Sequence, residues 1–190
     1  MNSRARVLTT LAHQQPDQLP IDFGSTFVTG IHVSCVAALR SHYGLEKRPI
    51  KVLDPGQMLG AIDEDLKTAM GVDVEGVIRR STKFGFPAED WKLFRMYDGL
   101  EVLVPGAFNT TVDENGDTLL YPQGDTSAPA SARMPNGWYF FDAIVRQPVL
   151  DEDRLDPNDN LEEFQPIAEV ELDYLRTATA SARATAPVYR

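Results

Sequence analysis

Four polar side chains that could contact a ligand lie close together between residues 20 and 34, which read "PIDFGSTFVTGIHVS". Asp22 interrupts an apolar segment, where a carboxylate must be paired, hydrogen-bonded or placed at the exit of the segment into a site. Ser25 and Thr29 belong to the loop that follows, and His32 begins a helix-like stretch. These four residues are candidates for substrate binding, and for Asp22 a structural role is the alternative.

The loop that joins these candidates, "GSTFVTG" at residues 24–30, follows an expected strand and precedes an expected helix. Backbone N–H groups at the start of a helix, together with the hydroxyl groups of the loop, can hold an anion. The loop is not a P-loop, because no lysine follows its second glycine, and it lacks the G-x-G-x-x-G pattern. The alternative is that Thr29 caps the helix and that the glycines relieve strain in the turn.

His32 and Cys35 are three residues apart, so they would share one face of a helix and could present two ligands to zinc. His13 and His42 are isolated and cysteine occurs once, so no second pair completes such a site. The alternative is a buried thiol beside a hydrogen-bonded histidine, and His32 as a lone acid or base also stays open. We therefore predict no metal ligand and assign no catalytic residue.

Aromatic side chains cluster at residues 137–144, "GWYFFDAI". In a strand, alternation would place Tyr139 and Phe141 on one face. Phe140 and Asp142 would then lie on the other face. Core packing explains most of this cluster, and a place for Tyr139 in a pocket is the alternative, which makes it the fifth candidate for substrate binding.

Composition restricts the classes of partner. The 190 residues are 43% hydrophobic and 24% charged, as in one globular domain, and the formal net charge is −10. This charge repels phosphate backbones and anionic lipids, so we expect neither nucleic acid nor membrane as a partner. A single cysteine excludes an intramolecular disulfide, and no signal peptide or transmembrane run is evident. We expect a cytoplasmic protein.

The elements that must position these residues alternate in the first half of the chain. Asp54, Pro55 and Gln57 are the residue types that begin a helix, and Gly71 is one that ends it. The first expected element is a helix that is capped by Ser3 and ended by a polar turn at 13–18. It is followed by a strand at 19–24, a helix at 30–44, a helix from Asp54 to Met70 and a strand at 72–80.

The second half of the chain has a different pattern. Residues 91–145 predict a β-meander, with two-residue hairpin turns in "YDGL" at 97–100 and "ENGD" at 114–117. A helix is expected at 168–184, and "PVY" at 187–189 has the residue types that begin a strand. The acidic runs at 63–66 and 151–163 are expected to be solvated surface. The order of elements favours an α/β protein with crossover helices.

Three blocks in this order resemble one protein family: "RVLTTLAHQQPDQLPIDFGSTFVTGIH" at 6–32, "LDPGQMLGAIDEDLKTAMGVDVEGV" at 53–77 and "DENGDTLLYPQGDTSAPASARMPNGWYFFDAI" at 113–144. The chain resembles the uroporphyrinogen decarboxylase superfamily, and more narrowly the branch grouped with corrinoid-linked methyltransferases. The resemblance covers nearly the whole chain, but only the amino-terminal half of the family's domain.

The resemblance implies the amino-terminal part of a (β/α)₈ TIM barrel, an incomplete barrel with an antiparallel β-meander insert. Ligands bind such barrels at the carboxyl ends of the strands, which would place Asp22, Ser25, Thr29 and His32 beside the cavity. The single partial domain would divide into the first two βα units at 1–90, the meander insert at 91–147, and a connection and helix at 148–190.

The family's chemistry carries over only in part. Residues 23–31 contain no arginine like those that hold carboxylates in true uroporphyrinogen decarboxylases, so porphyrinogen decarboxylation is not expected. The branch binds zinc in its carboxyl-terminal half, so zinc and a corrinoid would act only in a complete assembly and this chain alone binds neither.

The resemblance then implies half of a methyltransferase-like enzyme that moves a methyl group from a small methylated substrate to a corrinoid. Such a half would be inactive alone, because its open sheet edges need a complementary chain carrying the rest of the barrel, or a second copy in a homodimer. The alternatives are a non-catalytic binding or assembly module and a truncated family member.

Overall fold

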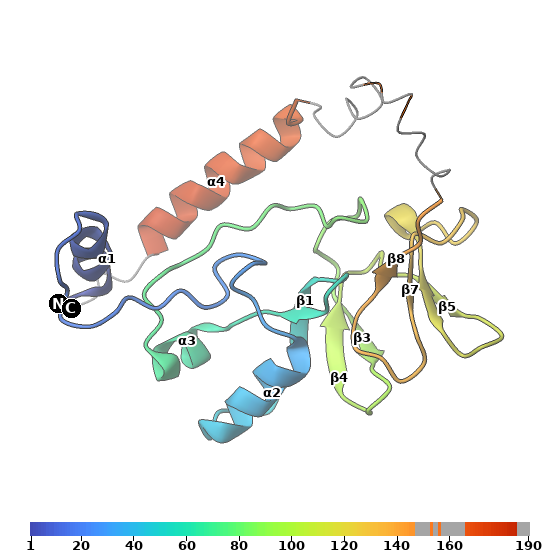
Figure 1. Ribbon diagram of the computed structural model, residues 1–190, viewed down its shortest axis with the longest axis horizontal. Helices are drawn as coiled ribbons and strands as arrows, with labels where there is room; N and C mark the ends of the chain where they lie inside the picture. Colours follow the sequence, from blue (N-terminus) through green and yellow to red (C-terminus); the bar gives the residue numbers. More distant parts are fainter. Residues whose placement is uncertain (147–152, 154–155, 157–165, 186–190) are drawn as a thin grey trace.

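A computed structural model describes residues 1–146, 153, 156 and 166–185 of the chain (Figure 1). The first half contains α1 (Ser3–Leu11), α2 (Val33–His42), β1 (Ile50–Asp54), β2 (Leu59–Gly60) and α3 (Glu64–Met70). The second half contains β3 (Lys92–Arg95), β4 (Glu101–Val104), β5 (Thr110–Val112), β6 (Thr118–Leu120), the 3-10 helix η1 (Pro122–Gly124), β7 (Ala132–Met134), β8 (Asp142–Ala143) and α4 (Glu169–Thr185).

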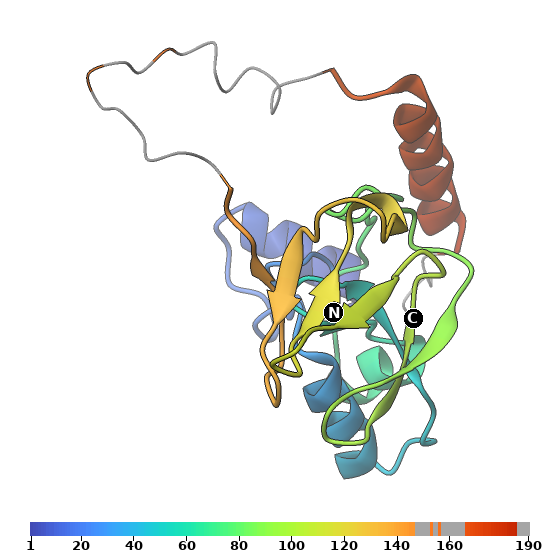
Figure 2. The same cartoon turned by 90° about the vertical axis from the view of Figure 1, so that its right-hand side faces the viewer.

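The strands form two small sheets that lie next to each other (Figures 1 and 2). One has the order β2-β1-β4-β3 and the other the order β5-β6-β7-β8. β1 and β4 are parallel, with Ile50 opposite Val102, and every other pair is antiparallel. The protein is thus mixed α/β as expected, and its described residues do not close into a barrel. The predicted meander is real for β5 to β8, whereas β3 and β4 join the sheet of β1.

One apolar core connects both sheets. Alternate residues of β1 and β4 point inward, so Val52, Val102 and Val104 are buried. α2 adds Val33 and Val36 against β1 and β2. The core continues through the second sheet with Leu120 and Ala132. Residues outside the strands complete it: Met58, Leu66, Phe86, Met96, Phe108 and Phe141.

The predicted helix from Asp54 to Met70 is wrong in its first half. Residues 50–54 extend as β1, the Asp54 carboxylate accepts the Gly56 N–H at 3.0 Å to close a turn, and α3 begins only at Glu64. The physical reason is that Leu59 and Gly60 pair with β1 as β2, while β1 pairs with β4, about fifty residues further along. Gly71 does end the helix, in the left-handed conformation, as predicted.

The predicted strands at 19–24 and 72–80 are irregular backbone instead. The two segments still lie side by side, since the Asp73 N–H donates to the Ile21 carbonyl at 2.8 Å. The Ile21 N–H donates in turn to the Asp73 carboxylate at 3.0 Å. A side chain therefore takes the place of the second backbone partner, and no regular ladder forms.

Both predicted hairpins form, but with longer turns than expected. Met96 donates to the Leu100 carbonyl, and Asp113 donates to the Asp117 carbonyl, so three residues lie between each pair. Only the glycine of each turn has a positive φ, +86° at Gly99. That conformation matches a type I turn followed by a left-handed residue rather than a two-residue turn.

The strand expected near 138–145 is only β8, and residues 138–141 are irregular. The helices at 30–44 and 168–184 are confirmed as α2 and α4, and α4 stands off from both sheets in Figures 1 and 2. Asn2, not Ser3, caps α1 by accepting the Ala5 N–H at 2.8 Å. Most of the run at 151–163, and all of 187–189, lies outside the described residues. No described helix has both the length and the apolar character to cross a membrane.

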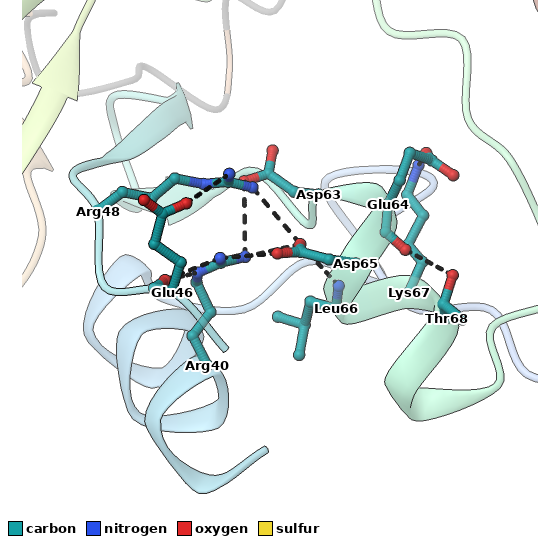
Figure 3. Close-up of polar contacts among 9 residues, drawn as sticks. All are labelled: Arg40, Glu46, Arg48, Asp63, Glu64, Asp65, Leu66, Lys67 and Thr68. Carbon is teal, nitrogen blue, oxygen red and sulfur yellow. Dashed lines mark hydrogen bonds and ion pairs between the residues drawn. The ribbon is translucent and has the colours of Figure 1, made fainter. Parts of the chain in front are cut away.

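The acidic run at 63–66 is more than solvated surface (Figure 3). The guanidinium of Arg40, only 2% exposed, donates to both carboxylate oxygens of Asp65 at 2.8 Å, and it also donates to the Glu46 carbonyl. Arg48 pairs with Asp63 at 2.8 Å. The hydrogen bonds from Arg40 lower the pKa of Asp65 to about 2. These pairs join α2 to α3.

Candidate functional site

A cavity of about 650 Å³ lies where the start of α2, the turn before β2 and the aromatic segment meet. Its size is in the range of small-molecule sites. Its walls are His32, Ser34 and Cys35 at the start of α2, Gln57 and Leu59 around β2, Lys83, and the run from Tyr139 to Ala143.

His32 joins two walls of this cavity. Its Nδ1 accepts the Ser34 N–H at 3.2 Å, which caps α2, so Thr29 is not the cap. Its Nε2 lies 2.9 Å from the Tyr139 carbonyl oxygen. Because a carbonyl can only accept, Nε2 carries the proton and the neutral tautomer is set. Both ring nitrogens are therefore hydrogen-bonded, and His32 connects the start of α2 to the aromatic segment. It is not a free acid or base here.

The same contacts bear on whether His32 and Cys35 could bind a metal ion. Neither ring nitrogen of His32 is free for a metal ion, and Cys35 is exposed at the cavity rather than buried, contrary to the alternative considered from the sequence. Within the part of the chain that the structure describes, no three histidine, cysteine, aspartate or glutamate side chains gather closely enough to hold a metal.

Tyr139 lines the cavity. Its ring meets the edge of His32 at a centroid distance of 5.8 Å and that of Tyr97 at 5.3 Å. The hydrogen bond with the Tyr139 hydroxyl raises the pKa of Tyr97 to about 12, so the Tyr97 phenol stays neutral at physiological pH. Strand alternation does not apply to this irregular segment, and Phe140 is exposed next to the buried Phe141.

The other three predicted residues, Asp22, Ser25 and Thr29, lie outside the walls of the cavity and hold their own loop together. The Asp22 carboxylate accepts the Thr29 hydroxyl at 3.2 Å and the Ser25 N–H at 3.3 Å. The Gly24 N–H donates to the Thr29 carbonyl at 2.9 Å. These contacts favour the structural role of Asp22. The polar groups that they involve form hydrogen bonds within the loop and are not directed at an anion.

Reasoning from the sequence missed Lys83, which lies in a stretch with no motif. Its ammonium reaches the cavity by lying against Gly56, where even a Cβ atom would overlap its end. The sequence predicts Gln57 as a capping residue in the first turn of a helix. That turn of helix does not form, and Gln57 lines the cavity instead. Lys83 meets Gly56 and the cavity only through the tertiary fold, so no local signal marked it.

Comparison with known proteins adds no identification. No family model matches the chain, and neither a curated protein nor a solved structure is significantly similar to it. The chemistry of the site is that of its walls: aromatic rings, one lysine, one aspartate and one exposed thiol. These groups are suited to holding a small molecule.

Proposed function

We propose that these residues form the amino-terminal part of a (β/α)₈ barrel in the uroporphyrinogen decarboxylase superfamily, in its corrinoid-linked methyltransferase branch. The role of the chain is to bind a small methylated donor in the cavity beside His32 and Tyr139. In the complete assembly a corrinoid would supply the acceptor for the methyl group. Zinc is not assigned to any residue described here.

The observation that carries this proposal is the course of two irregular segments. Ile21 bonds to Asp73, and four residues further on Ser25 lies against Gly76 so closely that a Cβ at residue 76 would overlap the Ser25 carbonyl. The two segments therefore run side by side in the same direction. Neighbouring strands of a (β/α)₈ barrel do the same, and the resemblance implies "LPIDFG" at 19–24 as the first barrel strand and "VEGVIRR" at 74–80 as the second, which overlap these two segments.

The place of the cavity supports the same proposal. The first segment leads through the loop at 24–30 into α2, and the first turn of α2 lines the cavity. In barrel enzymes the ligand lies at the carboxyl ends of the strands, where such loops begin. The cavity is therefore at the end of the segments where a barrel would bind its substrate.

The test is reconstitution. The chain is purified alone and together with a polypeptide carrying the remaining barrel strands, sought first in the neighbouring reading frame. We expect association by size-exclusion chromatography, zinc in the complex, and methylation of cob(I)alamin by methylated oxygen, sulfur or nitrogen donors, followed by visible absorbance. Catalysis by the chain alone, or no association and no methyl transfer with the second polypeptide, would overturn the proposal.

A non-catalytic binding module is the second candidate, and the two engaged nitrogens of His32 favour it. With that imidazole committed, the cavity has no free histidine for proton transfer. A binding module predicts that the cavity takes up its ligand in the chain alone and that the reconstituted complex gives no turnover. The reconstitution assay distinguishes the two candidates directly.

A further inference from the structure

Two opposite charges on the cavity wall have no ion-pair partner among the described residues. Neither the Lys83 ammonium nor the Asp142 carboxylate takes part in an ion pair or side-chain hydrogen bond within that part of the chain. The Lys83 Nζ lies 5.4 Å from the centroid of the Phe84 ring, in a cation–π contact. Both residues are exposed, so their charges are accessible to a ligand that enters the cavity. Two unpaired charges on one cavity wall are therefore suited to a ligand that brings both complementary charges.

The position of Lys83 depends on the backbone beneath it. Its ammonium lies where a Cβ of residue 56 would be, so only glycine leaves this space. The buried Asp54 carboxylate is close by but accepts the Gly56 N–H and makes no ion pair with Lys83. The Gly56 carbonyl accepts the Phe141 N–H at 2.8 Å, which connects this spot to the aromatic wall.

The wall beside Asp142 is aromatic. Tyr139 and Phe140 are 45% and 40% exposed, and both line the cavity. The faces of aromatic rings attract cations, and methylated ammonium groups are bound in this way because their charge is diffuse and their surface apolar. An aspartate next to such rings adds charge attraction without requiring an N–H donor.

We propose that the cavity binds a small methylated zwitterion of the betaine class. Its carboxylate pairs with Lys83, and its methylated ammonium lies against Tyr139 and Phe140 beside Asp142. The choice of a methylated ligand rests on the proposed function, since this group would be the methyl donor. The binding itself requires neither a corrinoid nor a second polypeptide.

The test is isothermal titration calorimetry of the full chain with three ligands of similar shape. Glycine betaine carries both charges, choline lacks the carboxylate, and 3,3-dimethylbutanoate lacks the positive charge. We expect each of the two controls to bind about tenfold or more weakly than glycine betaine, as for the loss of one charged contact. Equal affinity for all three ligands, or no binding of glycine betaine, would overturn the proposal.

Two variants assign the charges. Lys83→Met should abolish the preference for glycine betaine over choline, and Asp142→Asn should reduce the preference over 3,3-dimethylbutanoate to what the aromatic rings alone provide. Lys92→Met, at an exposed lysine of β3 outside the cavity, is the matched control and should leave all three affinities unchanged. If circular dichroism shows either variant folded and its preference unaltered, the assignment is wrong.

Failure of this inference can be separated from failure of the proposed function. Glycine betaine binding in a chain whose reconstituted complex transfers no methyl group refutes only the methyltransferase role. Methyl transfer from other donors, without betaine binding, refutes only the proposal that the cavity binds a methylated zwitterion.

Discussion

The paired segments at 19–30 and 72–76 differ from the two sheets in what stabilises them. The sheets contain regular backbone ladders over an apolar core that includes Val52 and Phe108. The paired segments have one direct backbone bond, and polar side chains complete their contacts. Arg6 illustrates this, because its guanidinium pairs with the buried Asp73 of the second segment and with Asp17 just before the first segment, which ties α1 to both places.

This difference teaches where solvent conditions should act. Burial of apolar surface depends little on pH or salt, whereas charge pairs depend on both. The hydrogen bonds of Arg6 and of the N-terminal amine lower the pKa of Asp17 well below its usual range. The paired segments should therefore be the part of the molecule that opens first in acid or high salt.

The largest expected effect is in the core of the sheets. Phe108 is 1% exposed and contacts the rings of Phe94 and Phe141. Phe108→Ala should lower the free energy of unfolding by about 3–5 kcal/mol, measured by urea denaturation. Phe140→Ala, at an exposed ring, is the control and should cost well under half as much. Equal losses would mean that the apolar core does not dominate the sheets.

A smaller effect is expected where the paired segments touch. Gly76→Ala puts a methyl group onto the Ser25 backbone, so the segments must separate, at a cost of about 1–3 kcal/mol. Hydrogen exchange should quicken at residues 21–25 and stay slow in β4 and β6. Val77→Ala, at the exposed neighbour, should leave exchange unchanged. Unchanged exchange in Gly76→Ala would contradict the close approach.

The ion pair of α1 should matter less to global stability and more to local opening. Asp73→Asn removes the charge opposite Arg6 while keeping an oxygen for the Ile21 N–H. We expect faster hydrogen exchange in α1 and at residues 19–24 with little change in the sheets. Glu114→Gln, in a turn and without an ion pair among the described residues, is the control. Faster exchange in the sheets as well would show that the two regions unfold together.

The smallest effect should be the acid dependence of the α2 and α3 junction. The pKa of Asp65 is about 2 in the folded protein and about 3.8 ordinarily, so its pairing with Arg40 stabilises the fold fully above pH 4. That contribution declines as the pH falls from about 4 towards 2, because the folded carboxylate then becomes protonated. Urea denaturation of Asp65→Asn should show a shallower decline over this range. An identical slope in both proteins would contradict the assignment.

How much could be predicted depended on how local each signal was. α2, α4, the Gly71 end of α3 and both hairpins follow from residues within a few positions of one another. The helix expected from Asp54 had good capping residues, yet the chain turns back after Asp54 and pairs with β1 as β2, and β1 pairs in turn with β4. Of the five site candidates, His32 and Tyr139 line the cavity, and Lys83 carried no signal at all.

Residue types and short spacings were enough to set the α/β character, the acidic surface, the turns and the helices that local capping and periodicity specify. Contacts that form only in the folded structure settled the rest: a turn and β2 in the first half of the expected helix, Asp22 as the centre of its own loop, and His32 with both nitrogens engaged. The physical reason is that backbone polar groups and carboxylates cost free energy when they are buried without a hydrogen-bond or ion-pair partner. The fold therefore depends on where their partners lie. Those partners lie up to 107 positions away, as between His32 and Tyr139.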